Sequence, residues 1–265
     1  MIEPVFPPQL VDCYRELEKV SLPDTALSLN GALLEKRVDR PILEYAPPVI
    51  DREQFVIVAG QVFELLARYL PQMAEDINSL QANLPENSSD RKALIEALLN
   101  RSGEAVSFLK NKTVIPPDVF GFAFSHVLRL YLSEYSRRLQ EELELDTWGR
   151  GNCPVCGSRP NFAKIDATGR RYLFCGLCGT EWRFMRVVCP FCGNMAIEEL
   201  NFYAVQGDPH RIDVCHRCKG YVKTIDMRGI QDTNPSLFWE DIKTVPLDMT
   251  IMQLGFINKT FGADM

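Results

Sequence analysis

The sequence has none of the long apolar runs that mark membrane proteins. Within its 265 residues, no stretch of about 18 uncharged apolar residues occurs, so we predict no membrane span. The first residues, MIEPVFPPQL, contain no basic cluster followed by an apolar core, and a secretory leader is therefore not expected. We expect a cytoplasmic protein. Thiols stay reduced there, and clustered cysteines bind metal or do redox chemistry more often than they form disulfides.

Residues of common catalytic sites are also scarce. The chain has only 3 histidines: His126 in an apolar helical pattern, His210 beside a proline in a turn, and His216 inside a cysteine pair. No glycine-rich phosphate loop and no Ser/His/Asp arrangement is recognisable. Cys13 stands apart from the other cysteines, and we interpret it as a helix-packing residue. The sequence therefore favours a protein that is not an enzyme.

Cysteine, by contrast, is concentrated in one region. Eight of the 9 cysteines form four Cys-x-x-Cys pairs, which we predict to be metal ligands: Cys153 and Cys156, Cys175 and Cys178, Cys189 and Cys192, Cys215 and Cys218. The first two pairs are separated by 18 residues and the last two by 22, and both spacings suit four-thiolate sites. The two-residue spacing lets one tight turn direct both sulfurs at the same ion. This pattern predicts two metal ions.

The cysteine-rich region also contains an internal repeat, because CPVCG at Cys153 returns as CPFCG at Cys189. Each unit reads as a β-hairpin with a cysteine pair at each end. Strands are expected at 160–166, 171–175 and 181–188, and again at 200–206, 211–215 and 221–227. The repeat favours sequential pairing with one ion per unit, although a cross-braced pairing of first with third and second with fourth is also possible.

The residue after each cysteine pair has a predicted role in the turn. Gly157, Gly179 and Gly193 follow the first three pairs, where a left-handed backbone is expected. Lys219 takes this place in the fourth pair, and Gly220 comes one residue later. The fourth turn is therefore expected to depart from the other three.

The N-terminal part is predicted to be helical. Apolar residues recur three or four positions apart at 51–74, 88–100 and 120–145. The expected buried faces comprise Phe55, Val58, Val62, Leu66, Tyr69 and Met73, and then Phe124, Leu128, Tyr131, Tyr135, Leu139 and Leu143. Asp51 with Gln54 resembles a helix-capping box.

The predicted fold class is α+β. A helical domain is expected over residues 1–149, followed by a first four-cysteine ribbon over 150–188 and a second over 189–265 with a C-terminal tail. Both ribbons are predicted to be rubredoxin-like or zinc-ribbon-like. The boundary at 149/150 rests on the change in composition at WGRGNCP.

Four thiolates suit either zinc or iron, and the residues alone favour a structural metal over a redox-active one. Thioredoxin-like chemistry is disfavoured, because glycine and a strand follow the pairs instead of a helix. Residues 150–228 hold 12 Lys and Arg against 7 Asp and Glu, an excess that offsets the formal charge of metal thiolates. The excess also fits nucleic-acid binding, but the whole chain has a net charge of −6, so no nucleic-acid partner is expected.

Taken together, CPVCGSRP, CGLCGTEW, CPFCGN, CHRCKGYVKTID and the tail VPLDMTIMQLGF resemble the formate dehydrogenase accessory protein family, the FdhE proteins. The resemblance covers essentially the whole chain. It implies a cytoplasmic factor that is needed for respiratory formate dehydrogenase activity and is linked to the catalytic subunit before twin-arginine export. It also implies rubredoxin-type iron sites with four of the paired cysteines per ion, and so favours iron over zinc.

The resulting hypothesis is a maturation factor that binds two metal ions and the immature catalytic subunit of formate dehydrogenase. One rival is a rubredoxin-like or dithiol oxidoreductase. The other is a zinc-ribbon protein that binds nucleic acid. The sequence predicts neither the surface that meets the client nor the oligomeric state.

Overall fold

The structure, a computed structural model, describes most of the chain. The described residues are 8–29, 39–110, 115–140, 145–204, 206–230 and 235–260. They form two compact units, which divide inside helix α5 (Pro117–Gln140). One unit comprises residues 8–29 and 43–135, and the other comprises residues 39–42 and 136–260. The domain limits at 149/150 and 188/189 stay a prediction.

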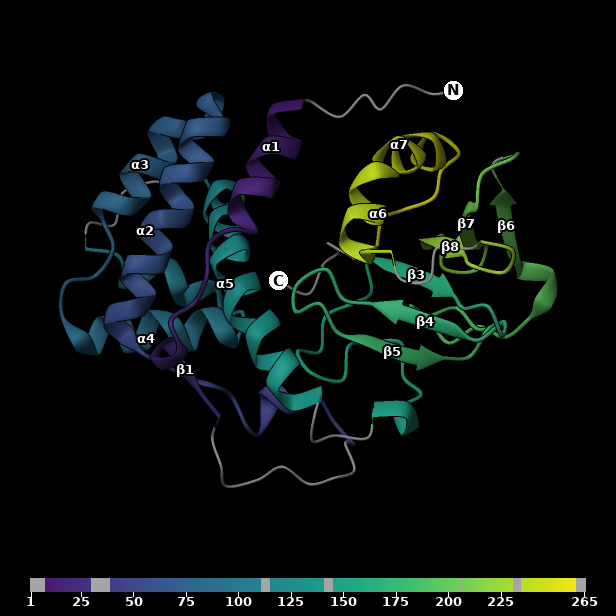
Figure 1. Cartoon of the computed structure of the whole chain (residues 1–265), viewed down its shortest axis with the longest axis horizontal. Helices are drawn as coiled ribbons and strands as arrows, with labels where there is room; N and C mark the ends of the chain where they lie inside the picture. The colour runs from purple at the N-terminus through teal and green to yellow at the C-terminus, as the bar shows by residue number, and fades with distance from the viewer. Residues whose placement is uncertain are drawn as a thin grey trace. The chain divides into compact units, whose positions relative to one another are not determined.

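The first unit is helical (Figure 1). Its helices are α1 (Pro8–Leu17), α2 (Arg52–Tyr69), α3 (Ala74–Ala82), α4 (Ser88–Leu99) and most of α5, with 3-10 turns at Asp24–Ala26, Pro71–Met73 and Gly103–Phe108. Two short strands, β1 (Leu27–Ser28) and β2 (Val49–Ile50), pair in antiparallel fashion. No helix in the described ranges is both long and apolar enough to cross a lipid bilayer.

Helix α2 begins where the sequence predicts and ends earlier. The carboxylate of Asp51 caps it by accepting hydrogen bonds from the backbone N–H groups of Glu53 (3.1 Å) and Gln54 (2.8 Å). The predicted helix 51–74 is wrong at its far end. Pro71 has no N–H to donate and restricts the residue before it, so the helix stops and the chain makes a 3-10 turn before α3.

Aromatic rings form the centre of the helical unit. Phe55 on α2 lies near Phe124 and Tyr131 on α5, with ring centroids 6.4 and 5.7 Å apart, and Phe63 meets Phe124 edge-on at 5.3 Å. The predicted face residues that the structure shows buried are Phe55, Val58, Val62, Leu66, Phe124, Leu128, Tyr131, Tyr135 and Leu139. Tyr69 and Met73 are partly exposed. Leu143 lies outside the described residues.

His126 on α5 gives the helical unit a dependence on pH. Its ring packs against Phe122 and Tyr14 at centroid distances of 4.8 and 5.5 Å. Burial, with a smaller contribution from Arg129, lowers the pKa of His126 to about 4. The unfolded chain takes up this proton near pH 6.5, so stability is full above that pH and is lost as the pH falls towards 4. Each pKa unit is worth about 1.4 kcal/mol, which makes the loss about 3 kcal/mol at most.

We therefore expect His126→Phe to flatten the pH profile of stability. Urea unfolding of both proteins at steps from pH 7 to pH 4.5 measures the effect. The free energy of unfolding of the wild type should fall more steeply than that of the variant. Equal slopes in the two proteins would contradict the assignment of this pH dependence to His126.

The second unit is built on one six-stranded sheet with the strand order β5-β4-β3-β8-β7-β6 (Figure 1). The strands are β3 (Phe162–Ile165), β4 (Arg171–Phe174), β5 (Glu181–Phe184), β6 (Leu200–Ala204), β7 (His210–Cys215) and β8 (Tyr221–Asp226). Each predicted hairpin contributes three antiparallel strands. A parallel pair of β3 and β8, with Phe162 opposite Lys223, joins the halves. The α+β class is confirmed, and the two ribbons share one sheet.

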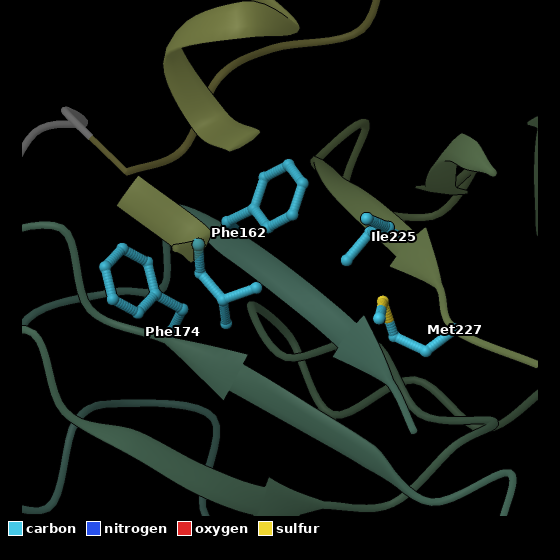
Figure 2. Packing of buried hydrophobic residues seen from close by; sticks show 5 residues of the cluster. Phe162, Phe174, Ile225 and Met227 are labelled. Atoms are coloured by element: carbon cyan, nitrogen blue, oxygen red, sulfur yellow. The ribbon is translucent and has the colours of Figure 1, made fainter. Parts of the chain in front are cut away.

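Helices α6 (Leu237–Lys243) and α7 (Val245–Gln253) pack on this sheet, and short 3-10 turns lie at Leu145–Thr147 and Ile197–Glu199. Figure 2 shows an apolar cluster in which Phe162, Phe174, Ile225 and Met227 lie together with Leu237 of α6. A further cluster consists of Ile212, Val214, Tyr221, Ile251 and Phe256. Both clusters join the sheet to the C-terminal segment, for which the sequence had predicted no elements.

Candidate metal centres

The first centre contains the four cysteines of the first repeat. The Sγ atoms of Cys153, Cys156, Cys175 and Cys178 all lie within 4.8 Å of one another. The sulfur of Cys153 is 3.4 Å from that of Cys178, and the sulfur of Cys156 is 3.5 Å from that of Cys175. None of the four residues is more than 5% exposed. This cluster is closed to solvent.

The second centre contains the four cysteines of the second repeat and is more open. Its Sγ atoms also lie within 4.8 Å of one another, with 3.7 Å between Cys189 and Cys218 and 3.8 Å between Cys192 and Cys215. Cys189 and Cys215 are buried, Cys218 is partly exposed and Cys192 is exposed. The structure thus brings the predicted cysteines together sequentially, with one cluster in each repeat, and not in the cross-braced arrangement.

Both clusters suit a tetrahedral metal ion. Sulfurs bound at about 2.3 Å to such an ion are about 3.8 Å apart, which matches the second centre, and the first is slightly tighter. A disulfide would need about 2 Å, and all the cysteines are free thiols. Burial raises the pKa values of the Cys153 and Cys178 thiols well above the ordinary value. Their thiolate forms are therefore unfavourable unless a nearby cation stabilises them. Each cluster could therefore hold one metal ion, and four sulfurs suit zinc and iron alike.

Backbone hydrogen bonds shape the turn at each cysteine pair. In the first pair, the N–H of Cys153 donates to the carbonyl of Ser158 (2.8 Å), and the N–H of Gly157 donates to the carbonyl of Cys153 (2.9 Å). The second and third pairs repeat both bonds. The glycines at the predicted positions have φ values of +75° for Gly157, +70° for Gly179 and +69° for Gly193. Their left-handed backbone confirms the predicted role.

The fourth turn keeps this shape without glycine at the left-handed position. Lys219 has a φ of +59°, a conformation that costs a residue with a Cβ about 1 kcal/mol. Its carbonyl accepts a hydrogen bond from the N–H of Ile257 (2.7 Å), and its ammonium group lies 5.7 Å from the ring centre of Phe256. Gly220 is required for another reason, because a Cβ there would lie 2.8 Å from the ring of Phe191.

Replacing Lys219 with glycine should therefore raise the free energy of unfolding, by up to about 1 kcal/mol. Metal content should not change, because the sulfurs keep their positions. The matched control is Arg217→Gly in the same turn, where φ is not positive and glycine should destabilise by about 0.5–1 kcal/mol. Urea unfolding of the metal-loaded proteins measures both changes. A less stable Lys219→Gly variant would show that the contact with Phe256 outweighs the backbone strain.

Hydroxyl groups surround the first centre. The Oγ1 atom of Thr180, which is fully buried, lies 2.9 Å from the sulfur of Cys178 and 2.7 Å from the Oγ of Ser136. The Oγ of Ser158 lies 3.2 Å from the sulfur of Cys156. Hydroxyls in these positions can donate to thiolates and so fix the ligands and adjust the properties of a bound metal.

At the second centre, amide N–H groups lie beside the sulfurs in place of hydroxyls. The side-chain N–H of buried Asn194 lies 3.6 Å from the sulfur of Cys215, and the N–H of Gly220 lies 3.4 Å from the sulfur of Cys218. Burial alone would raise the pKa of Cys215, but the backbone N–H of Cys218 and the Asn194 amide outweigh it and lower that pKa to about 7. The second centre is therefore both more polar and more accessible than the first.

Arg171 on β4 links the first ribbon to the second. Its guanidinium group is 3% exposed, lies 3.5 Å from the carboxylate of Asp213 on β7, and donates to the carbonyl of Val188 at 3.1 Å. Val188 directly precedes Cys189 of the second cluster. A charge buried on one ribbon is thus compensated by the other.

The remaining sequence candidates lie outside the clusters. His216 packs against Phe256, with ring centroids 5.3 Å apart. The interpretation of His210 as a turn residue is wrong: it begins β7, and its ring nitrogens lie 2.5 Å from Asp208 and 2.9 Å from Glu240. Cys13 is fully buried, and burial raises its pKa to about 11, which agrees with a packing role.

The polar residues that support the sulfurs were not predicted from the sequence. Ser158, Thr180 and Asn194 each stand two places after the second cysteine of a pair, and Gly220 holds the same place in the fourth. The repeated position was a signal that could have revealed three of them. Ser136 and Arg171 gave no such signal, because only the folded chain brings them close.

Known proteins are similar to this chain in sequence and in fold. A protein of Aquifex aeolicus named "Protein FdhE homolog" is 30% identical over 242 residues, which cover 88% of this chain and 78% of that protein. The chain belongs to the FdhE family. The sequence profile described as "FdhE, central domain" matches residues 152–186, the first four-cysteine repeat.

Further FdhE relatives agree with this assignment. The homolog from Actinobacillus pleuropneumoniae is 29% identical over 199 residues, which cover 72% of this chain and 61% of that relative. The crystal structure of the FdhE protein from Pseudomonas aeruginosa superposes with a TM-score of 0.56 at 19% identity, over 98% of this chain and 80% of that one. The last comparison shows a common fold.

Proposed function

We propose that this member of the FdhE family is an accessory factor in formate dehydrogenase maturation and not itself an enzyme. It binds the immature catalytic subunit in the cytoplasm, before the twin-arginine export of that subunit, and it takes no nucleic-acid partner. The observation that carries the proposal is the pair of four-cysteine clusters on one sheet in an FdhE-family chain. Two clusters of four sulfurs on one sheet, each able to hold an ion, support this proposal.

The eight clustered cysteines ligate two metal ions in this proposal, four to each ion, with iron favoured over zinc. Protein purified without air should contain about two irons per chain and show a reversible, thiolate-to-ferric absorption. Colourless protein with two zincs would indicate that the metal ions have a structural role in the ribbons. That result would remove iron from the proposal and leave client binding to be judged separately.

Co-purification with the catalytic subunit tests the client. The immature subunit is expressed with the tagged protein in the absence of air, and bound subunit is quantified after affinity capture. The expected result is retention of the subunit by the wild type and by Cys13→Ser, whose thiol lies outside both clusters. No retention by the wild type, with both metal sites loaded, would contradict the proposed function.

A second candidate is a rubredoxin-like electron carrier. Exposed Cys192 and partly exposed Cys218 favour it, because electrons reach a metal more readily through ligands near the surface. This candidate requires a metal that cycles between two oxidation states. Client activation that persists with redox-inert zinc in both centres would exclude it.

A further inference from the structure

The two edge strands of the six-stranded sheet differ in how well they are protected against pairing with a further strand. At one edge, β5 carries the charged residues Glu181 and Arg183, and the turn Leu145–Thr147 packs beside it. At the other edge, β6 has no charged residue and no proline, and it is exposed from Asn201 to Ala204. Among the described residues, β7 is the only strand paired with it. Unprotected edges of this kind recruit further strands.

The backbone of β6 offers hydrogen bonds on its open side. The N–H of His216 donates to the carbonyl of Glu199 at 2.8 Å. This bond shows which residues of β6 form hydrogen bonds with β7. Such bonds recur at every second residue of an antiparallel pair, so Asn201 and Tyr203 bond to β7. The N–H and C=O groups of Leu200, Phe202 and Ala204 therefore point away from β7.

Apolar side chains gather beside this edge. A cavity of about 250 Å³ is lined by Val187, Ile197, Leu200 and Phe202, among others. The exposed fractions are 49% for Val187, 72% for Ile197 and 58% for Phe202. Such exposure of large side chains around one cavity marks an interaction site rather than scattered surface residues.

The charges around the cavity favour an acidic group in the occupant. Arg171 and Arg211 both pair with Asp213 in the lining, where a metal thiolate centre adds further negative charge through Cys189 and Cys215. These inner charges compensate one another. Arg186 also lines the cavity, is exposed, and has no ion pair with any residue in the described ranges.

We propose that β6 binds an extended peptide segment of a partner protein, which adds a strand to the open edge of the sheet. The segment pairs with the backbone of Leu200, Phe202 and Ala204, places apolar side chains over Phe202 and Ile197, and directs an acidic side chain to Arg186. Main-chain pairing supplies affinity, and the cavity supplies specificity. The inference does not depend on the identity of the client, because it rests on the open edge, the cavity and Arg186.

Synthetic peptides test the inference on the full, metal-loaded chain. The probe is a fluorescent seven-residue peptide, Val-Thr-Glu-Thr-Val-Thr-Val, in which the valines and the single glutamate lie on the same strand face, and its binding is followed by fluorescence anisotropy. One control peptide replaces glutamate with lysine. Another keeps the side chains but carries N-methyl groups on alternate backbone nitrogens, which removes strand pairing. Binding of the first peptide at least tenfold tighter than that of either control is expected.

Variants of the protein locate the site. Ala204→Pro removes one outward N–H without breaking the bonds to β7, and it should weaken binding about tenfold, while Ala204→Val keeps the N–H and should bind normally. Arg186→Glu should shift the preference towards the lysine peptide. Its matched control is Arg183→Glu on the opposite edge strand, which makes the same change of charge and should have no effect.

Several outcomes would overturn the inference. These are no binding of the valine–glutamate peptide at millimolar concentration, equal binding of its N-methylated form, or insensitivity to both Ala204→Pro and Arg186→Glu. A wild-type dimer that Ala204→Pro converts to a monomer in sedimentation would assign the edge to a second copy of the chain. If Ala204→Pro fails to fold, the N-methylated peptide still decides the question on the wild type.

Discussion

Replacing Cys175 with serine should abolish metal binding at the first centre and destabilise the ribbon unit. Cys175 is fully buried, and its sulfur is one of four that converge within 4.8 Å. Formation of a structural metal site is coupled to folding, so the loss of one ligand costs several kcal/mol. We expect a fall in melting temperature of about 10 °C or more. Metal analysis and thermal unfolding by circular dichroism measure both effects.

Two further variants serve as comparisons for Cys175→Ser. Cys13→Ser removes a buried thiol outside both centres and should leave the metal content unchanged. Cys192→Ser removes an exposed cysteine of the second cluster and should destabilise the chain less than Cys175→Ser does. Because β3 and β8 pair within one sheet, Cys175→Ser should also weaken metal binding at the second centre. A second centre that binds metal with unchanged affinity would show that the ribbons act independently.

Replacing Arg171 with methionine should destabilise the chain by about 3 kcal/mol, because it removes one member of a buried ion pair. Asp213 would lose its partner at 3.5 Å and keep Arg211 at 2.9 Å, and the carbonyl of Val188 would lose its donor. The effect should reach the second centre through the chain next to Cys189. Urea unfolding and competition with a metal chelator measure the two consequences.

The exposed neighbour Arg170 provides the control for this prediction. Arg170→Met makes the same chemical change on the surface, and it should alter stability by no more than about 0.5 kcal/mol. An Arg171→Met variant as stable as this control would mean that methionine packs against Phe184 as favourably as the ion pair does. The ion pair would then add no stability to the junction between the ribbons.

Local patterns account for the parts of the structure that the sequence predicted. The spacing of the cysteines, the glycines after them and the alternation around the turns specify each hairpin within about 30 residues of chain. The helical faces of α2 and α5 follow from apolar residues three and four apart, and Asp51 caps α2 as expected. The end of α2 was predicted too late because the apolar periodicity continues to Met73. Pro71 ends the helix despite that periodicity.

The features that the sequence did not reveal depend on contacts between distant segments. The joining of β3 to β8 sets Phe162 opposite Lys223, a pairing that no periodicity encodes. Lys223 is 3% exposed and bonds to Asp241 and Asp248 in the C-terminal helices, at 2.8 and 2.5 Å. The predicted departure of the fourth turn is also limited, because Ile257 and Phe256 in the tail support Lys219.

The parallel pairing of β3 with β8 also sets an order of events during synthesis. The four cysteines of the first centre, from Cys153 to Cys178, leave the ribosome before any part of β8, so the proposed metal site can form early. The sheet closes only when residues up to Asp226 are available, since closure joins strands far apart in the chain. Until then, β3 is an unpaired edge strand of the first ribbon. Chains still in synthesis therefore expose β3 as an open edge, which invites aggregation until β8 pairs with it.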